Sequence, residues 1–435
     1  KAYVYQELVK LFADQDHAEA LQDRQDQGLD PREALDAAHP YGHFSHILIG
    51  LTSFCPVNCS FCWARAVTDR KSATLLNDRA VERILTYVHA REIPVLVLTG
   101  GEAFTAVDKI LKIIKEARVE KISISTSGYF ATSSENAQKM FDRIVRALEE
   151  RQEAGLSPVK IDIRVSADEF HWHVSSRVLA NIIHVFDKFN ASKYKDISLM
   201  IDAMLTARDP LPGFIDRLGG TLVKAGRDVY QPVDQVRMRS GFSIPVKYQE
   251  VRLVDETIDT DVAATDFERV YAEKRHKEKI LIGQDMAHGG AILFISHDGV
   301  VSLQAFLKKF PLANVNDDDF ERAIERRLNY DPLVVALRKW GLNAVLDVAS
   351  MVKPDIRMRA LQANNMYMGI TDIVQDENVR RYVYQELKRM LELEMGRPAD
   401  ESIPGGVDMK KMALDRQGPG RDVYFDPAIM QDILE

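Results

Sequence analysis

The chain has 435 residues, of which 46% are hydrophobic and 28% are charged. This balance is ordinary for a folded globular protein and excludes a disordered, collagen-like or coiled-coil chain. As a soft prior, the length predicts roughly three domains, or one large domain with extensions. The net charge of −8 argues against nucleic acid as the main partner. No signal peptide opens the sequence and no apolar run reaches the roughly 18 residues of a membrane span, so we expect a soluble cytoplasmic protein with no membrane partner.

Residues 1–38 have a helical pattern, and from Ile47 a strand–helix alternation begins. The predicted strands are Ile47–Thr52, Val95–Thr99, Lys121–Thr126, Val159–Ser166, Ile197–Ala203 and Val246–Val254. The predicted helices are Arg79–Arg91, Thr105–Ala117, Asn136–Glu153, Ser176–Lys188 and Pro212–Ala225. This alternation predicts βαβ units and a parallel sheet. Six such strands fit an open, partial (β/α)6 TIM barrel better than a closed barrel of eight.

The predicted strands alternate apolar and polar residues. In Val159–Ser166, Asp162 and Arg164 fall on the face opposite Ile161 and Ile163. In Val246–Val254, Tyr248, Glu250 and Arg252 fall on the polar face, opposite Val251 and Leu253. We expect the apolar faces to pack under the helices and the polar faces to line an open lumen that holds a polar ligand. A half-exposed antiparallel sheet would alternate in the same way, but the intervening helices favour the barrel.

The rhythm changes after about residue 256. A helix is predicted over Thr265–Lys277, short strands over Lys279–Ile282, Ala291–Ser296 and Val300–Gln304 with a turn at His297–Gly299, and a long helix over Glu377–Met395. These changes divide the chain into an N-terminal helical segment (1–44), the barrel (45–256), a mixed helix and hairpin extension (257–305) and a mostly helical C-terminal region with a loose tail (306–435).

All three cysteines of the chain, Cys55, Cys59 and Cys62, follow the first predicted strand. Ligand sites of parallel α/β folds lie at this edge of the sheet. Three thiols could hold zinc with His43 or His46 as a fourth ligand, or could be inert. They could also hold a cubane iron–sulfur cluster with one iron left open, since such a cluster normally takes four thiolates.

The arrangement Cys55-x3-Cys59-x2-Cys62, with an aromatic residue at Phe61, resembles the signature of radical S-adenosylmethionine (SAM) enzymes. The segment Thr99–Glu102 follows the second predicted strand and matches the Gly-Gly-Glu motif of the same superfamily. The resemblance covers about residues 45–255, and it implies that the three thiolates hold one [4Fe–4S] cluster whose fourth iron is chelated by SAM. One electron would then cleave SAM to methionine and a 5′-deoxyadenosyl radical, which abstracts hydrogen from a substrate.

The resemblance also implies a set of SAM contacts. Gly100 and Gly101 would admit the methionyl amino group, Glu102 would fix it by charge, and Ser166 would contact the ribose. Ser125, Thr126 and Ser127 would bind the SAM carboxylate, and Phe61 and Trp63 would border the adenine. Ordinary helix caps are the alternative for the hydroxyl residues, and a plain turn for the glycines.

Further polar residues near the ends of the predicted strands are candidates for catalysis or substrate binding. They are Asp168, Glu169, His171, Arg164, Asp202, Tyr248, Glu250 and Arg252. The alternatives are a capped helix start after the fourth strand and a structural salt-bridge network across the barrel.

The C-terminal extension resembles those that carry auxiliary clusters, but Gln304 stands near the place of an expected cysteine. We therefore expect one cluster only, with an external one-electron reductant such as flavodoxin or ferredoxin. A polar small molecule, such as a sugar, nucleoside or amino-acid derivative of specialised metabolism, is the expected substrate. The alternatives are a peptide-modifying maturase, which the short segment before the barrel and the missing cysteines disfavour, and a non-catalytic metal-bearing scaffold. The oligomeric state is left open.

Overall fold

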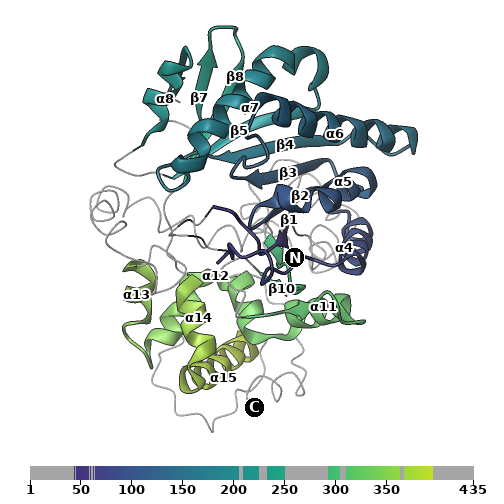
Figure 1. Ribbon diagram of the computed structural model, residues 1–435. Coiled ribbons are helices and arrows are strands. Elements are labelled where there is room, and N and C mark those ends of the chain that lie inside the picture. The colour runs from purple at the N-terminus through teal and green to yellow at the C-terminus, as the bar shows by residue number, and fades with distance from the viewer. Residues whose placement is uncertain are drawn as a thin grey trace, which may run out of the picture.

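An eleven-stranded sheet organises the computed structural model (Figure 1). The structure describes residues 44, 46–57, 59, 62, 64–204, 209–224, 233–249, 292–303, 310–362 and 367–394. The strands lie in the order β11-β10-β9-β1-β2-β3-β4-β5-β8-β7-β6. Their bounds are β1 His46–Thr52, β2 Val95–Gly100, β3 Lys121–Thr126, β4 Lys160–Ser166, β5 Ile197–Met204, β6 Gly220–Val223, β7 Val233–Met238, β8 Ser243–Gln249, β9 Ile292–Ile295, β10 Val300–Ser302 and β11 Ala313–Asn314.

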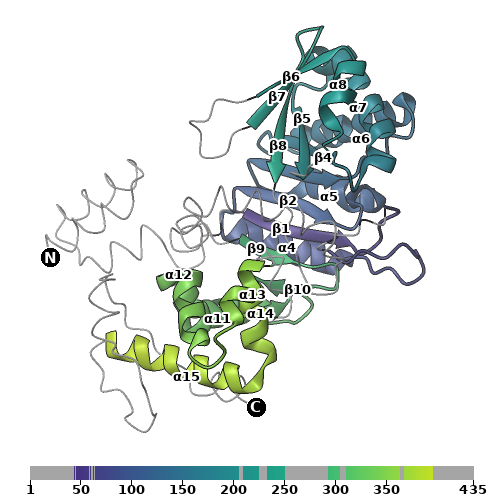
Figure 2. The same cartoon turned by 90° about the vertical axis from the view of Figure 1, so that its left-hand side faces the viewer.

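The strands from β9 through β1–β5 to β8 pair in parallel, and antiparallel strands extend both ends of the sheet. The barrel helices follow their strands: α4 Asp78–Ala90, η1 Ala103–Ala106, α5 Val107–Glu116, α6 Ser134–Glu153, α7 Trp172–Lys193 and α8 Leu211–Arg217. Figure 2 shows α5, α6, α7 and α8 along one side of the sheet. The fold is therefore the expected open α/β barrel, and the described barrel helices lie on one face of its sheet.

The alternation of residue types explains why these segments form half-covered strands. Ile161, Ile163 and Val165 of β4 are fully buried, and their register partners in β3 and β5 are buried too, mostly isoleucine with one leucine and one threonine. Between them, Arg164 and Ser166 point to the other face and are half-buried. The apolar face thus packs under the helices, and the polar face is left available for a ligand.

A second group of helices follows the sheet: α11 Phe320–Tyr330, α12 Pro332–Ser350, α13 Ile356–Gln362, α14 Tyr367–Gln375 and α15 Glu377–Glu394. Figures 1 and 2 both place this group beyond the β9–β11 end of the sheet. Asp331 begins α12 by accepting hydrogen bonds from the backbone N–H groups of Leu333 and Val334. The predicted domain boundaries stay predictions, although the sheet itself runs across residue 256, since β9 pairs with β1.

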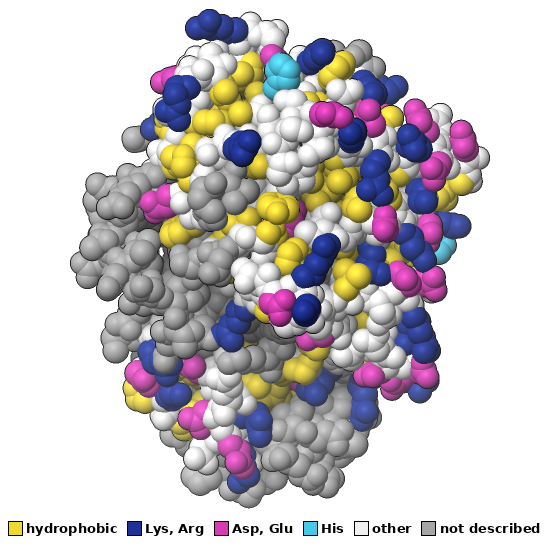
Figure 3. All heavy atoms as spheres, viewed as in Figure 1, with side chains coloured by type: hydrophobic (Ala, Val, Ile, Leu, Met, Phe, Trp, Pro, Cys, Tyr) yellow, Lys and Arg dark blue, Asp and Glu magenta, His cyan; other side chains and the backbone are white. Residues whose placement is uncertain are grey.

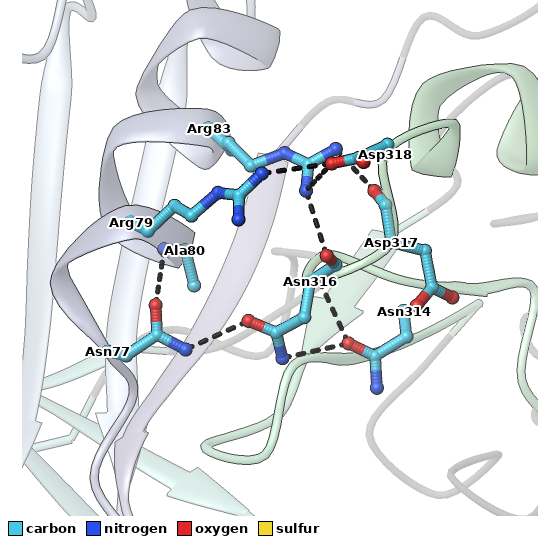
Figure 4. A network of polar contacts seen from close by, with 8 residues as sticks. All are labelled: Asn77, Arg79, Ala80, Arg83, Asn314, Asn316, Asp317 and Asp318. Carbon is cyan, nitrogen blue, oxygen red and sulfur yellow. Dashed lines mark hydrogen bonds and ion pairs between the residues drawn. The ribbon is translucent and has the colours of Figure 1, made fainter.

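A network of polar side chains joins this region to the barrel at α4 (Figure 4). Arg83 donates to the backbone oxygens of Asn316 (3.0 Å) and Asp317, and its guanidinium lies over the ring of Phe320. Asn77, which caps α4, donates to Asn316 Oδ1 at 2.8 Å. A shallow cavity of about 370 Å³ lies beside Arg83, at this junction and away from the cysteines. We treat it as part of the junction because its lining carries none of the candidate catalytic residues.

Two features of the sheet were not predicted. The antiparallel pair β6 and β7 lies in a region expected to be helical or loop, and β9 joins the barrel sheet beside β1 rather than forming a separate hairpin. The hairpin between β9 and β10 is confirmed, with Gly299 at φ +85° in its turn. The predicted helices over 1–38 and Thr265–Lys277, the strand Lys279–Ile282 and the tail from residue 397 lie outside the described residues.

Candidate active site at the carboxyl edge of the sheet

Functional candidates follow the ends of adjacent parallel strands, and the carboxyl ends of such strands meet at one edge. The segments concerned are the cysteine segment after β1, Gly100–Glu102 at the end of β2, Ser125–Ser127 at β3, Ser166–His171 after β4 and Asp202 in β5. Of the sequence candidates, Phe61, Trp63, Glu250, Arg252 and Gln304 lie outside the described residues.

The cysteine segment is a series of tight turns. The backbone N–H of Cys59 donates to Val57 O at 3.2 Å, and that of Cys62 donates to Cys59 O at 3.3 Å. Burial raises the pKa of Cys55 to about 12. The pKa of Cys59 is also raised to about 12, mainly by burial and in addition by the negative charges of Cys62 and Cys55. The three thiols therefore lie within electrostatic reach of one another.

The donor set fits an iron–sulfur cluster better than a single metal ion. Among the described residues, no group of three His, Cys, Asp or Glu side chains is placed to hold a single metal ion. A cubane instead places each thiolate on a different iron, which spreads the sulfurs apart. His46 cannot complete a zinc site, because it begins β1 whereas Cys55 follows its end, a separation of about 20 Å along the strand. His43 lies outside the described residues.

The segment that follows the cysteines, residues 64–77, runs back along them. The backbone N–H of Cys55 donates to Val67 O at 3.0 Å, and Ser53 N–H donates to Thr74 O at 2.9 Å. Thr74 Oγ1 in turn lies 2.5 Å from Nδ1 of His297, in the turn after β9. Thr74 and His297 were not candidates from the sequence, because their contact joins segments 223 residues apart and leaves no local signal.

The two glycines of the Gly-Gly-Glu motif are required by the close approach of β1. A Cβ on Gly100, which has φ +124°, would lie 2.5 Å from Thr52 O, and one on Gly101 would lie 2.1 Å from Phe54 O. The backbone N–H groups of Gly101 and Glu102 donate to these same two oxygens at 2.6 and 2.7 Å. The absent side chains thus let the motif bind the chain that leads into Cys55. The contact of Gly100 and Gly101 with SAM stays a prediction.

Glu102 is buried, with 1% of its surface exposed. Its Oε1 accepts from Phe104 N (3.1 Å) and Thr126 Oγ1 (2.6 Å), and its Oε2 accepts from Ser127 N (2.8 Å) and Ser127 Oγ (2.5 Å). The motif after β2 is thereby joined to the end of β3. Ser125, by contrast, is half-buried on the polar face, in register with Arg164.

Asp168 organises the turn between β4 and α7. Its Oδ1 accepts from the backbone N–H groups of Phe170 (3.0 Å) and His171 (3.1 Å), and it lies 2.9 Å from His171 Nδ1. Asp168 is buried, and its charge contributes to the raised pKa of Cys59. Glu169, beside it, is half-buried. Asp168 therefore caps this turn, whereas α7 itself starts after His171 without a side-chain cap. The expected capped helix start is not found, and the proton-transferring role stays a prediction.

Arg164 and Asp202 form an ion pair of 2.6 Å on the polar face of β4 and β5. Arg164 Nε and Asp202 Oδ1 are buried and find no hydrogen-bond partner among the described residues, which is costly unless another group, a ligand or water supplies one. Ser166, half-buried, is in register with Asp202. Tyr248 does not join this group: it pairs in register with Ala203 on the helix-covered face, and its hydroxyl donates to Asp209. The expectation that Tyr248 lines the polar face is therefore wrong.

The fold and the site define a class of protein: an open α/β barrel with a three-thiol site at its carboxyl edge, bound directly to a Gly-Gly-Glu motif. A family model described as the radical SAM superfamily matches residues 49–209. Residues 49–209 thus match the radical SAM superfamily, whose members are enzymes that use a [4Fe–4S] cluster and SAM.

Individual relatives are distant. GTP 3′,8-cyclase from Bradyrhizobium diazoefficiens is 24% identical over an alignment of 235 residues. The alignment covers 48% of this chain and 64% of that protein, less than two thirds of its length. Among solved structures, BtrN in complex with AdoMet and 2-DOIA shows 12% identity and a TM-score of 0.35 over 69% of this chain and 89% of that one. Native anSMEcpe with bound AdoMet and the Cp18Cys peptide shows 14% identity and a TM-score of 0.39 over 64% and 80%. The described residues contain no helix long and apolar enough to cross a membrane.

Proposed function

We propose that this protein cleaves SAM reductively and directs the resulting radical to a polar small molecule, such as a sugar, nucleoside or amino-acid derivative. The cluster and SAM, when bound, supply a 5′-deoxyadenosyl radical that abstracts hydrogen. The chain's own residues hold these groups, orient the substrate and exclude water. The observation that carries the proposal is the direct bonding of the Gly-Gly-Glu motif to the segment that leads into Cys55.

In this proposal Cys55, Cys59 and Cys62 hold the cluster. SAM lies over the ends of β2 to β4, against Gly100 and Gly101, with Ser166 near its ribose and Phe61 and Trp63 near its adenine. The remaining residues at the ends of β2 and β3 in this proposed site are Glu102, Ser125, Thr126 and Ser127.

The polar substrate is supported by the pair Arg164 and Asp202. Among the described residues, neither the Nε–H donor of Arg164 nor the Oδ1 acceptor of Asp202 has a hydrogen-bond partner. A ligand that offers both an acceptor and a donor, such as a hydroxyl or amide group, would satisfy the two atoms at once. Asp168 holds His171 in one orientation and makes it a candidate to move a proton at Nε2.

The reductant in this proposal is an acidic protein such as flavodoxin or ferredoxin, acting in the cytoplasm. Residues 64–77 contain three basic residues, Arg65, Arg70 and Lys71, and one acidic residue, Asp69, so this segment is positively charged although the chain has a net charge of −8. Arg70 and Lys71 are exposed, and so is Leu75 (54%). This segment covers Cys55, so an acidic donor bound to it would lie close to the cluster. Elsewhere, on the face shown in Figure 3, charges of both signs are interspersed.

The sequence contains no cysteine beyond the three of the site, so the proposal includes one cluster. A peptide substrate is the alternative. The pair Arg164 and Asp202 would then serve a backbone amide instead of a hydroxyl, and the substrate screen described below separates the two.

The test is anaerobic reconstitution with iron and sulfide, followed by addition of SAM and dithionite. We expect about four irons per chain and 5′-deoxyadenosine, with both lost in Cys59→Ala. Deuterated sugars, nucleosides and peptides would then be screened for transfer of deuterium into 5′-deoxyadenosine. Zinc in place of iron, or a loaded cluster that cleaves no SAM, would refute the proposal.

A further inference from the structure

We infer that Glu102 is a positioning residue: its carboxylate fixes the end of β3 to the cysteine segment and does not itself contact SAM. The inference departs from the role that the motif resemblance implies for this residue. It rests on the proposed function only in naming SAM as the ligand, because the contacts that support it lie within the protein.

The first argument is that the Glu102 carboxylate has no hydrogen-bond acceptor position left for a ligand. An ionised carboxylate offers about four lone-pair directions, and Glu102 accepts four hydrogen bonds, two at each oxygen. With only 1% of the residue exposed, no side of the group is open to a fifth donor. An ammonium group of a ligand would have to displace one of these bonds.

The second argument is that Glu102 connects three strand ends. Its own backbone follows β2, its N–H donates to Phe54 O next to Cys55, and its carboxylate holds Thr126 and Ser127 at the end of β3. A shift of the Glu102 side chain would therefore move the end of β3 relative to the cysteine segment even with no ligand present.

The third argument concerns the direction of the hydroxyl protons. Thr126 and Ser127 both donate to Glu102, and Thr126 Oγ1 also accepts from the backbone N–H of Gly128 at 2.9 Å. Ser127 Oγ is left with acceptor capacity only. A ligand group that meets it must be a donor, so Ser127 fits the ammonium of SAM and not the carboxylate that the motif resemblance implies.

The first experiment is hydrogen exchange, followed by mass spectrometry, on protein without cluster or SAM. Glu102→Gln keeps the size of the side chain but turns an acceptor into an NH2 group, which cannot accept from Ser127. We expect exchange at least about tenfold faster over 126–128 and 53–55. Glu153→Gln, an exposed matched control on α6, should leave both segments unchanged. Unchanged exchange in Glu102→Gln would overturn the positioning role.

The second experiment measures binding of SAM and of decarboxylated SAM, which keeps the ammonium, to cluster-loaded protein by calorimetry. We expect Ser127→Ala to weaken both ligands by the same factor, roughly tenfold. A loss confined to SAM would show that Ser127 serves the carboxylate and would overturn the argument from proton direction. If the unmodified protein bound neither ligand, the proposed function would fail, and the exchange result would still decide the role of Glu102.

Discussion

Replacing Gly101 with alanine tests how closely the motif is fitted to the cysteine segment. The added Cβ would lie 2.1 Å from Phe54 O, 2.5 Å from Phe54 C and 3.0 Å from Ser53 C. All three atoms are backbone, so no side chain can rotate away to relieve the contact. The segment must retreat by about 1 Å or more to reach normal van der Waals separation.

Such a retreat would break the hydrogen bonds that Gly101 and Glu102 donate to Thr52 O and Phe54 O, which measure 2.6 and 2.7 Å. Each contributes about 1 kcal/mol, and the overpacking adds about 1–3 kcal/mol. We therefore expect Gly101→Ala to lower the free energy of unfolding by about 3–5 kcal/mol, or to displace Cys55 and lose iron.

The assay is urea unfolding of the cluster-free protein together with iron content after anaerobic reconstitution. Gly213→Ala on α8 is the matched control, because its Cβ would meet nothing closer than 3.8 Å. It should be neutral or slightly stabilising, since glycine inside a helix is unfavourable. Full iron content and unchanged unfolding in Gly101→Ala would refute the reasoning.

Three further predictions concern packing away from the site. Arg83→Ala should leave unfolding of the barrel nearly unchanged but should release α11, because Arg83 donates to two carbonyls beside α11 and covers Phe320. The release would be seen as faster proteolysis after residue 310, and equal proteolysis of the variant and the unmodified protein would contradict the prediction. Arg151→Met should cost about 2–4 kcal/mol in urea unfolding, because the buried guanidinium donates to Ser157 O, Ile114 O and Ala117 O; a neutral result would mean that these carbonyls find water. Burial raises the pKa of Tyr87 to about 12 from 10, so the folded state holds this proton more tightly, and the stability is complete below pH 10 and is lost as the pH rises toward 12. The loss should reach about 3 kcal/mol and should disappear in Tyr87→Phe.

The sequence predicted the central strands well because each is a local pattern. The bounds of β3 agree with the prediction at both ends, and the buried face of β4 follows directly from its alternating isoleucines. The pairing of β9 with β1 could not be predicted, since two short apolar segments far apart in the chain carry no local mark of their partnership.

The error at Tyr248 shows how sensitive a face assignment is to phase. The prediction took its phase from Val251 and Leu253, but β8 ends at Gln249. Since side chains alternate along a strand, a shift of one residue moves every one of them to the other face. The Gly-Gly-Glu motif was located correctly, yet its glycines meet backbone of the same chain, a close approach that only the three-dimensional fold reveals.

The partnership of β1 with β9 has a consequence for synthesis on the ribosome. The strand that leads into the cysteines is made early, but its partner on that side, β9, follows roughly 250 residues later, which at about 5–20 residues per second is a delay of tens of seconds. Until then β1 has an unpaired edge, and the turn that brings His297 to Thr74 does not exist. The nascent chain therefore presents its thiols before their surroundings are complete.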